Sequence, residues 1–149
     1  MKDFYMKEAL KEARKAFELG EIPIGAIIVR DNEIIARAYN LRESTKDPTA
    51  HAEILAIRRA SEALGGWRLT GCDLYVTIEP CPMCAGAIVM ARINRLFIGS
   101  MDPKAGSAGS LYNIVDDNRL NHRVKVIYNV LSSECSNIMK EFFKKLRKK

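Results

Sequence analysis

Residues 73–98, with the sequence DLYVTIEPCPMCAGAIVMARINRLFI, decide the fold class of this chain. The stretch begins with residues 73–78, a run rich in β-branched and aromatic side chains that predicts a strand. A helix is predicted over residues 82 to about 92, and a short apolar strand over residues 95–98. A strand, a helix and a second strand in succession favour a crossover with parallel pairing. The stretch therefore predicts a layered α/β sandwich.

Hydrophobic periodicity extends this alternation to both ends of the chain. Two strands are predicted at residues 24–30 and 33–39, and Asp31-Asn32 between them is typical of a tight hairpin. A helix is predicted over residues 48–64, with Asp47 as its N-cap. The other predicted elements are helices at residues 3–19 and from about 133, a helical turn at 111–115 and a fifth strand at 124–130. Apart from the first hairpin, we expect parallel pairing.

Composition and charge restrict the class of protein. The chain has 149 residues, which fits a single domain spanning residues 1–149. With 48% apolar and 28% charged residues, it is neither a disordered tail nor a membrane protein. Its longest uncharged stretch, residues 80–91, is shorter than the roughly 17 residues needed to cross a bilayer. The charged N-terminus lacks the apolar core of a signal peptide. We therefore expect a cytoplasmic protein whose four cysteines are reduced, metal-bound or catalytic.

The positive charge of the chain is concentrated at the C-terminus. The last ten residues hold six basic residues and one acidic residue, so almost all of the net charge of +6 lies there. A helix over residues 133–149 would have an apolar stripe that includes Phe142 and Phe143, with lysines opposite. Four interpretations stay open: a docked helix with a solvated basic face, a contact to phosphates, a membrane-surface helix, or a stacking ring for an unpaired base.

Three short segments point to one metal site. Cys81 and Cys84 are three residues apart at a predicted helix start, so both can bind the same ion. His51 and Glu53 lie near the start of another predicted helix, where side chains lean toward the N-terminus and reach an object beyond the helix end. One imidazole and two thiolates suit zinc, and three protein ligands leave a fourth tetrahedral position open for water. Glu53, which is not needed as a ligand, is free to move protons.

Two other interpretations of the cysteines compete with a catalytic zinc site. A closed structural site would use Cys72 as a fourth ligand, but Cys72 and Cys81 flank opposite ends of a strand, more than about 20 Å apart. A dithiol redox pair would leave His51 and Glu53 without a role. Cys72 and Cys135 are expected to be small buried hydrophobes.

The H-x-E and P-C-x-x-C segments resemble the zinc-dependent nucleoside and nucleobase deaminases. Further segments narrow the resemblance to the bacterial tRNA-specific adenosine deaminases, and it runs from the first helix to the basic tail. These segments are IPIGA at 22–26, NLR at 40–42, DPTAHAE at 47–53, EPCPMCAGA at 79–87, DPKAGSAGSL at 102–111 and LNHR at 120–123, followed by Phe142-Phe143 and basic residues. The later loop and tail carry the inference about substrate class.

The resemblance implies a fold, a reaction and a cofactor. The fold is the three-layer α/β/α cytidine-deaminase-like fold with a central mixed five-stranded sheet. The reaction is hydrolytic conversion of adenosine to inosine, with release of ammonia, at the wobble position (34) of a tRNA anticodon. The resemblance also implies one Zn²⁺ per subunit held by His51, Cys81 and Cys84, Glu53 as proton shuttle, a cytoplasmic homodimer and no membrane partner.

The resemblance also implies contacts to the anticodon stem-loop. The expected contact residues are Asn40, Ala52, Asp102, Lys104, Ser107, His122, Arg123, Phe143, Lys144 and Arg147. Plainer structural roles stay open for several of them: a polar residue that ends a strand at position 40, a flexible loop around 102–107, a structural histidine at 122 and a core aromatic at 143. Because the tail is dominated by lysine, it offers point charges more than the planar forks of arginine.

Two other functions remain open at this stage. The zinc segments determine the reaction and leave the substrate undecided, so a deaminase of a free nucleobase or nucleoside, of guanine or cytosine type, fits them too. The basic tail favours RNA over such a neutral substrate. A non-catalytic zinc module that binds RNA is the alternative outside enzymes, and Glu53 argues against it because a structural zinc site has no use for that carboxylate.

Overall fold

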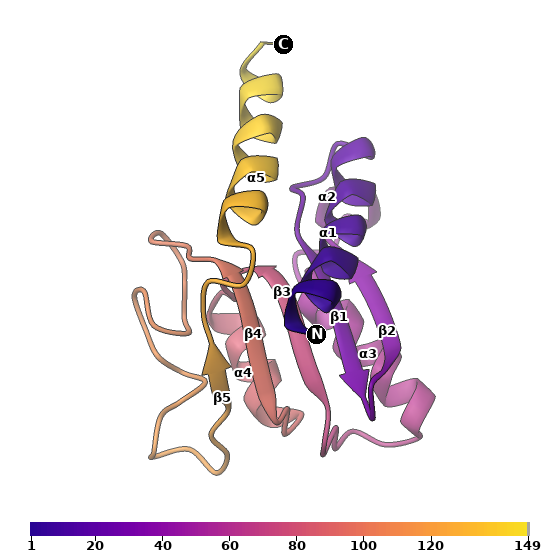
Figure 1. Cartoon of the computed structure of the whole chain (residues 1–149), viewed down its shortest axis with the longest axis vertical. Coiled ribbons are helices and arrows are strands. Elements are labelled where there is room, and N and C mark those ends of the chain that lie inside the picture. The colour runs from indigo at the N-terminus through magenta and orange to yellow at the C-terminus, as the bar shows by residue number, and fades with distance from the viewer. Residues whose placement is uncertain (149) are drawn as a thin grey trace.

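The computed structural model describes residues 1–148, so the expectation that the domain and its basic helix reach Lys149 concerns a residue outside the described part. Five strands form one sheet in the order β2-β1-β3-β4-β5 (Figure 1). The strands are β1 (Gly25–Arg30), β2 (Glu33–Tyr39), β3 (Asp73–Ile78), β4 (Arg95–Ser100) and β5 (Lys125–Ile127). The helices are α1 (Lys2–Glu18), α2 (Arg42–Thr45), α3 (Ala52–Leu64), α4 (Pro82–Met90) and α5 (Ser132–Arg147). No helix in the described residues is long and apolar enough to cross a membrane.

The sheet is mixed, as the sequence predicts. The β3–α4–β4 unit pairs in parallel with Asp73 opposite Arg95, and β5 adds to β4 in parallel. The first hairpin pairs antiparallel, and β1 also pairs antiparallel with β3. Asp31 and Asn32 have φ values of 51° and 64°, which is the conformation of a type I′ turn and matches the twist of the two strands.

Helices cover both faces of the sheet, which confirms the three-layer α/β/α fold (Figure 1). One face packs on α1 and α5, and its core contains Ile27, Tyr75 and Phe97. The other face packs on α3 and α4, and its core contains Ile28 and Val76 among others. Neighbouring residues of one strand point to opposite faces, so the apolar runs of β1, β3 and β4 reflect burial on both sides.

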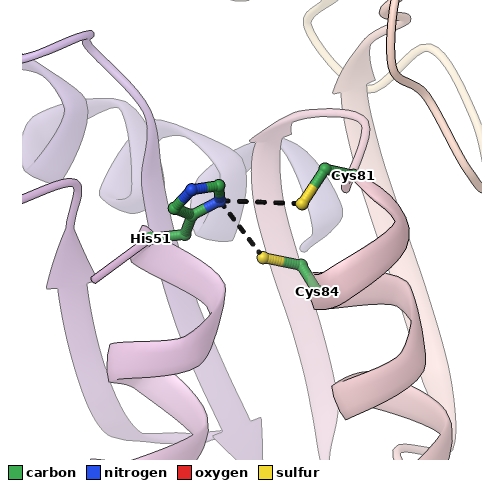
Figure 2. Close-up of side chains that lie close together, drawn as sticks. All are labelled: His51, Cys81 and Cys84. Atoms are coloured by element: carbon green, nitrogen blue, oxygen red, sulfur yellow. Dashed lines mark hydrogen bonds between the residues drawn. The ribbon is translucent and has the colours of Figure 1, made fainter. Parts of the chain in front are cut away.

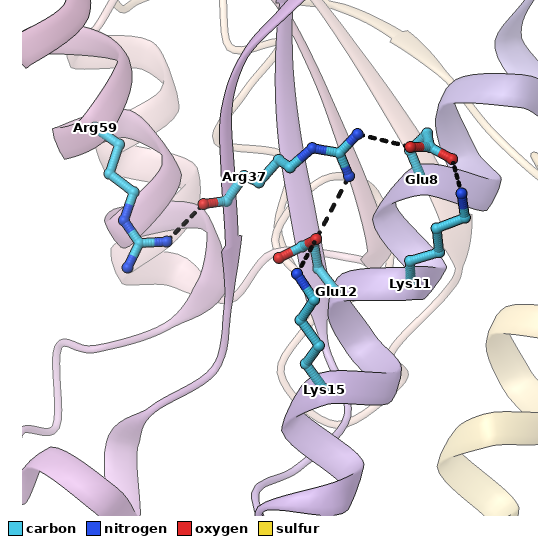
Figure 3. A network of polar contacts seen from close by, with 6 residues as sticks. All are labelled: Glu8, Lys11, Glu12, Lys15, Arg37 and Arg59. Carbon is cyan, nitrogen blue, oxygen red and sulfur yellow. Dashed lines mark hydrogen bonds and ion pairs between the residues drawn. The ribbon is translucent and has the colours of Figure 1, made fainter.

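A polar network fixes α1 to the edge strand β2 (Figure 3). The Arg37 guanidinium of β2 lies 2.6 Å from the Glu8 carboxylate and 3.4 Å from the Glu12 carboxylate, both on α1. Lys11 and Lys15 pair with the same two carboxylates. From the opposite face, the guanidinium of Arg59 on α3 donates to the carbonyl oxygen of Arg37. The network therefore connects both helix layers to a strand whose outer edge has no partner strand among the described residues.

The second predicted helix begins later than expected. Asp47 is not its N-cap, because α3 starts at Ala52 and His51 is the capping residue. The Asp47 carboxylate instead accepts hydrogen bonds from the Thr49 amide (2.8 Å) and hydroxyl (2.7 Å). This local turn competes with helix formation, as Asp side chains often do. The four-residue helix α2 before it was not predicted.

Other boundaries also differ from the predictions. Residues 111–115 do not form a helical turn; Asn113 there pairs with Ala108 as an isolated bridge. The fifth strand covers Lys125–Ile127 and not residues 124–130. The helix predicted to residue 92 ends at Met90, and β4 continues to Ser100.

Candidate active site

Two helix starts face each other at one end of the sheet and bring the predicted metal ligands together (Figure 2). His51 is the N-cap of α3 and Cys81 is the N-cap of α4, and both have extended backbone conformations. Cys84 follows in the first turn of α4, where Pro82 at the first helical position favours initiation. The partial positive charge of both helix ends favours thiolates at this point.

The spacing of the three donor atoms fits a zinc ion. His51 Nδ1 lies 3.7 Å from Cys81 Sγ and 3.5 Å from Cys84 Sγ. Zinc–sulfur bonds of about 2.3 Å and zinc–nitrogen bonds of about 2.0–2.1 Å put the sulfur and nitrogen corners of a tetrahedron about 3.6 Å apart. All three donors lie within 4.8 Å of one another, and among the described residues theirs is the one cluster of His, Cys, Asp and Glu that could hold a metal.

The thiols are electrostatically coupled in a way that also favours a cation. The hydrogen bond from Cys84, together with that from His51, lowers the pKa of Cys81 to about 4. The pKa of Cys84 is raised because it keeps the proton shared with Cys81 and because it is buried. The hydrogen bond to Cys81 raises the pKa of His51. Two thiolates at this separation repel one another, so a divalent cation between them allows both to ionise.

Glu53 lies beside this cluster as a buried carboxyl group. Its side chain is in the first turn of α3 and the residue is 4% exposed. Burial, with a smaller contribution from the negative charge of Cys81, raises the pKa of Glu53 to about 7. A carboxyl group with this pKa can both accept and donate a proton at neutral pH, as a general acid–base catalyst must.

The other two cysteines are remote from the cluster, as predicted. Cys72 precedes β3 and is fully buried in the core between the sheet and α3/α4, whereas Cys81 follows the other end of β3. Cys135 is buried in the core on the α5 face. A closed site with Cys72 as fourth ligand is therefore excluded, and the donor set of His51, Cys81 and Cys84 keeps one tetrahedral position for water.

Two of the predicted RNA-binding residues lie near this end of the sheet in buried positions. Asn40 directly follows β2, is 5% exposed, and uses its amide to donate to the Ile22 carbonyl oxygen (3.4 Å) and to accept from the Arg42 amide (3.3 Å). Ala52, the first residue of α3, is fully buried. The sequence reasoning assigned no role to Glu21, whose buried carboxylate accepts from the first backbone amides of α2.

The loop that contains Asp102, Lys104 and Ser107 also lies at this end. Ser107 is fully buried, and its amide donates to the carbonyl oxygen of Pro80, the residue before Cys81 (2.9 Å). The Asp102 carboxylate accepts from the Lys104 amide (3.0 Å), so it stabilises the turn that exposes the Lys104 side chain. Hydrogen bonds within the loop and to Pro80 therefore hold its conformation.

A cavity of about 710 Å³ opens between this loop and α5. Its lining includes Asp102 and Lys104 of the loop, Phe143 and Arg147 of α5, and Ile22. The cavity lies at the same end of the sheet as His51, Cys81 and Cys84 but does not include them. Sequence reasoning missed the residues that complete it, which are Ile24, Ile78, Ser100, Met101, Pro103, Ser136, Met139 and Lys140. Lys144 is exposed on α5 beside Phe143, outside the lining of the cavity.

His122 and Arg123 lie elsewhere. His122 Nε2 is 2.6 Å from the carbonyl oxygen of Ile93, just before β4 begins. Since β4 runs from there toward the site, the length of a strand, roughly 20 Å, separates His122 from the cavity and the metal ligands. The Arg123 guanidinium donates to the Asp116 carboxylate (2.7 Å). Within one chain, the structure does not bring these two residues to the site.

The fold and the His/Cys/Cys site with a buried glutamate define a deaminase of the cytidine-deaminase-like class. The family profile of MafB19-like deaminases matches residues 1–147. The chain is 54% identical over 147 residues to the tRNA-specific adenosine deaminase of Bacillus subtilis, covering 99% of this chain and 91% of the relative. It is 52% identical over 146 residues to the protein of that name from Aquifex aeolicus, covering 98% and 96%.

Solved structures agree with this assignment. A structure from a study of A-to-I editing by tRNA:A34 deaminases superposes with a TM-score of 0.87 at 48% identity and covers 91% of this chain and 98% of that one. A guanine deaminase from Nitrosomonas europaea superposes with a TM-score of 0.79 at 21% identity over 92% of this chain and 81% of that one, which shows the shared fold alone. The chain belongs to the MafB19-like deaminase family and, within it, to the group of tRNA-specific adenosine deaminases. The protein is therefore a deaminase enzyme.

Proposed function

We propose that the protein converts adenosine to inosine at wobble position 34 of a tRNA anticodon by hydrolysis, with release of ammonia. The observation that carries this proposal is the His51/Cys81/Cys84 cluster with buried Glu53 beside it, in a chain about half identical to tRNA-specific adenosine deaminases over its whole length. Residues 1–149 would act as one catalytic domain, and a cytoplasmic location would follow from the tRNA substrate.

His51, Cys81 and Cys84 would hold one Zn²⁺ per subunit. Zinc bound in this way lowers the pKa of water and acts as a Lewis acid. Glu53 would take the proton released as water adds to C6 of adenine, and would deliver it to N1. The C6–N6 bond then breaks, and the amino group leaves as ammonia when Glu53 transfers the remaining hydroxyl proton to it. The pKa of Glu53 near 7 supports both halves of this proton transfer.

The RNA would bind across the cavity beside α5. Asn40 and Ala52 would contact the flipped base, and Asp102, Lys104 and Ser107 would border the anticodon. Phe143 would stack on a neighbouring base, while Lys144 and Arg147 would neutralise phosphates. The cavity lined by Asp102, Lys104, Phe143 and Arg147 supports this arrangement because it combines an aromatic ring with cationic side chains.

We also propose a homodimer in which α4 lies at the interface. The sequence of α4, PMCAGAIVM, contains no charged residue, although the helix is not fully buried. Met83 is 37% exposed and Met90 67% exposed on its outer side. A second copy of the chain would remove this apolar face from water. Light scattering should therefore give twice the chain mass of 16.8 kDa, and a monomeric mass at micromolar concentration would contradict the homodimer.

The decisive experiment uses a short anticodon stem-loop with adenosine at position 34. The zinc-loaded protein, Glu53→Gln and Glu62→Gln are each incubated with the stem-loop and, separately, with free adenosine, cytidine and guanine. Glu62 is exposed on the same helix, so its variant controls for loss of a carboxylate from α3. We expect inosine in the stem-loop with the wild type and Glu62→Gln, and a loss of at least a hundredfold, on the order of a general acid–base contribution, with Glu53→Gln.

Other outcomes would change the assignment. Deamination confined to a free base or nucleoside would keep the zinc chemistry and remove tRNA as the substrate. Absence of any reaction, with zinc bound and RNA retained, would favour the non-catalytic RNA-binding module.

A further inference from the structure

Glu79 is a buried carboxylate to which the proposed chemistry gives no role. It directly follows β3 and lies two residues before Cys81, and it is 3% exposed. The structure keeps this carboxyl group in the interior, next to the proposed metal ligands, and surrounds it with hydrogen-bond donors.

All four hydrogen bonds to this carboxylate come from one loop. Oε1 accepts from the Asp102 amide (2.9 Å) and the Ser110 hydroxyl (2.5 Å). Oε2 accepts from the Ala108 amide (3.0 Å) and the Ser110 amide (3.0 Å). The donors belong to both ends of residues 102–110, so the Glu79 side chain connects the beginning of the loop to its end.

The backbone of the loop is fitted closely around Glu79. A Cβ atom on Gly106 would lie 2.2 Å from Glu79 Oε1, so only glycine leaves room for the carboxylate. The Gly106 amide donates to the Asp102 carbonyl oxygen (2.8 Å), and the Ser107 amide donates to the Pro80 carbonyl oxygen (2.9 Å). The loop thus rests on the segment that leads directly into Cys81.

This loop forms one wall of the cavity beside α5, through Asp102, Pro103 and Lys104. We propose that Glu79 is a positioning residue for the RNA substrate: it holds residues 102–110 in the conformation that binds the anticodon, without itself touching the RNA. This inference rests on the proposed function for the identity of the substrate, whereas the ordering of the loop by Glu79 is independent of it.

The pattern of partners requires a carboxylate at this position. Three of the four partners are backbone amides, which can only donate, and the Ser110 hydroxyl alone could also accept. A glutamine NH₂ group in place of either oxygen would therefore face at least one amide, which loses at least one hydrogen bond and opposes like groups. Glu79→Gln is therefore the informative variant, although it removes no atoms. Gly106→Ala provides a second route that leaves the Glu79 side chain itself unchanged, because the added Cβ would collide with the carboxylate and with the Asp102 carbonyl oxygen.

The experiment compares the zinc-loaded full-length wild type with Glu79→Gln and Gly106→Ala. Gly66→Ala is the matched control, since a Cβ there meets nothing within 4 Å. The measurements are KM and kcat on the anticodon stem-loop, zinc per chain, and hydrogen exchange of the amides in residues 102–110. We expect both variants to raise KM about tenfold or more with a smaller change in kcat, to keep one zinc, and to exchange the Asp102, Ala108 and Ser110 amides faster. Gly66→Ala should match the wild type.

Three results would overturn the inference. Loss of zinc with a fall in kcat at constant KM would mean that Glu79 supports the metal ligands and not the loop. Unchanged exchange in residues 102–110, with lower thermal stability, would mean a general structural role. Faster exchange of the loop with unchanged KM would mean that the loop does not bind substrate. If the wild type leaves the stem-loop unmodified, the proposed function fails, and the exchange data still decide whether Glu79 orders the loop.

Discussion

The convergence of the proposed metal ligands depends on His51 and Cys81, the N-caps of α3 and α4. His51 and Glu53 are two apart, so inside an ideal helix they would point in directions about 200° apart. As the N-cap, His51 has φ −80° and ψ 153°, which places its imidazole beyond the helix end. Glu53, in the first turn, approaches the same point from within the helix. The sequence predicts this convergence because it depends on local geometry.

The distinction between a ligand cysteine and a core cysteine gives a direct test. Cys81→Ala should abolish stoichiometric zinc and the deaminase reaction, because it removes one of three donors that lie within 4.8 Å of one another. Cys72→Ala should keep zinc and cost about 1 kcal/mol of unfolding free energy, because it only leaves a small gap in the core. Metal analysis after dialysis and denaturant unfolding measure the two effects. A Cys72→Ala protein without zinc would contradict the assignment of ligands.

The hydrogen-bond partners of Glu79 could not be predicted from the sequence. Its position between a strand and Cys81 is visible in the sequence, but its partners lie 23 to 31 residues further along. Nothing local in the sequence specifies those hydrogen bonds. Two features are visible in the sequence: an acidic residue after a largely apolar strand, and a glycine-containing loop with a serine. Neither feature indicates that the two segments are in contact.

At the level of helices and strands, the predictions succeed where periodicity is strong and fail where polar side chains fold the backbone locally. The strand β3 occupies the predicted residues, because six consecutive buried positions leave little choice of conformation. The start of α3 was predicted at Pro48 because Asp47-Pro48 has the form of a helix start. The hydrogen bonds between Asp47 and Thr49 form a separate turn there. The helix begins at Ala52, two residues after the buried Ala50.

The network between α1 and β2 predicts a pH-dependent contribution to stability. Hydrogen bonds from Lys11 and Arg37 lower the pKa of Glu8 in the folded protein. A lowered pKa contributes stability that is complete above the ordinary value of 4.5 and is lost as the pH falls through the folded-state value. Arg37→Met should therefore cost about 1 kcal/mol at pH 7, a modest figure because the guanidinium is 39% exposed and screened.

Urea unfolding of the wild type and Arg37→Met between about pH 3 and pH 7 tests this effect. The difference between the two proteins should shrink as the pH falls below 4.5. Arg14→Met is the matched control, since its pair with Glu141 is long (3.4 Å) and exposed on both sides. A difference that stays constant with pH would mean that Arg37 stabilises through its aliphatic stem and not through its charge.

For the molecule as a whole, the sequence predicts the layers of helices and sheet better than the conformations of the loops. Parallel pairing of β3 with β4 follows from the crossover through α4. The position of the first hairpin beside β3, and the course of residues 101–124, depend on contacts between distant segments. Tyr128, for example, donates to the Ala108 carbonyl oxygen (2.7 Å), and Ala108 also pairs with Asn113, where the sequence predicts a helical turn. Such contacts have no signature in a single sequence.

The distribution of charge over the whole molecule makes a final prediction about RNA binding. Arg147 of α5 lines the cavity and Lys144 is exposed on the same helix. Arg123 directly follows His122, which contacts Ile93 just before the start of β4, at the far end of the sheet. Each phosphate contact that is lost should reduce the slope of log affinity against log salt by about 0.7 to 0.9. Lys144→Gln and Arg147→Gln should each show this reduction with the stem-loop. Arg123→Gln should not, since a charge roughly 20 Å away is screened beyond the Debye length.

Titrations between about 50 and 200 mM salt, in the Glu53→Gln background to prevent turnover, measure these slopes. Equal reductions for Arg123→Gln and Arg147→Gln would mean that the RNA extends along the protein to the start of β4, or that the second subunit of a dimer brings Arg123 to the first subunit's cavity. Heterodimers that carry Arg123→Gln in one subunit and Arg147→Gln in the other would then separate these two geometries. If one subunit supplies both contacts, each of the two sites loses one contact; if the second subunit supplies Arg123, one site keeps both contacts and the other loses both.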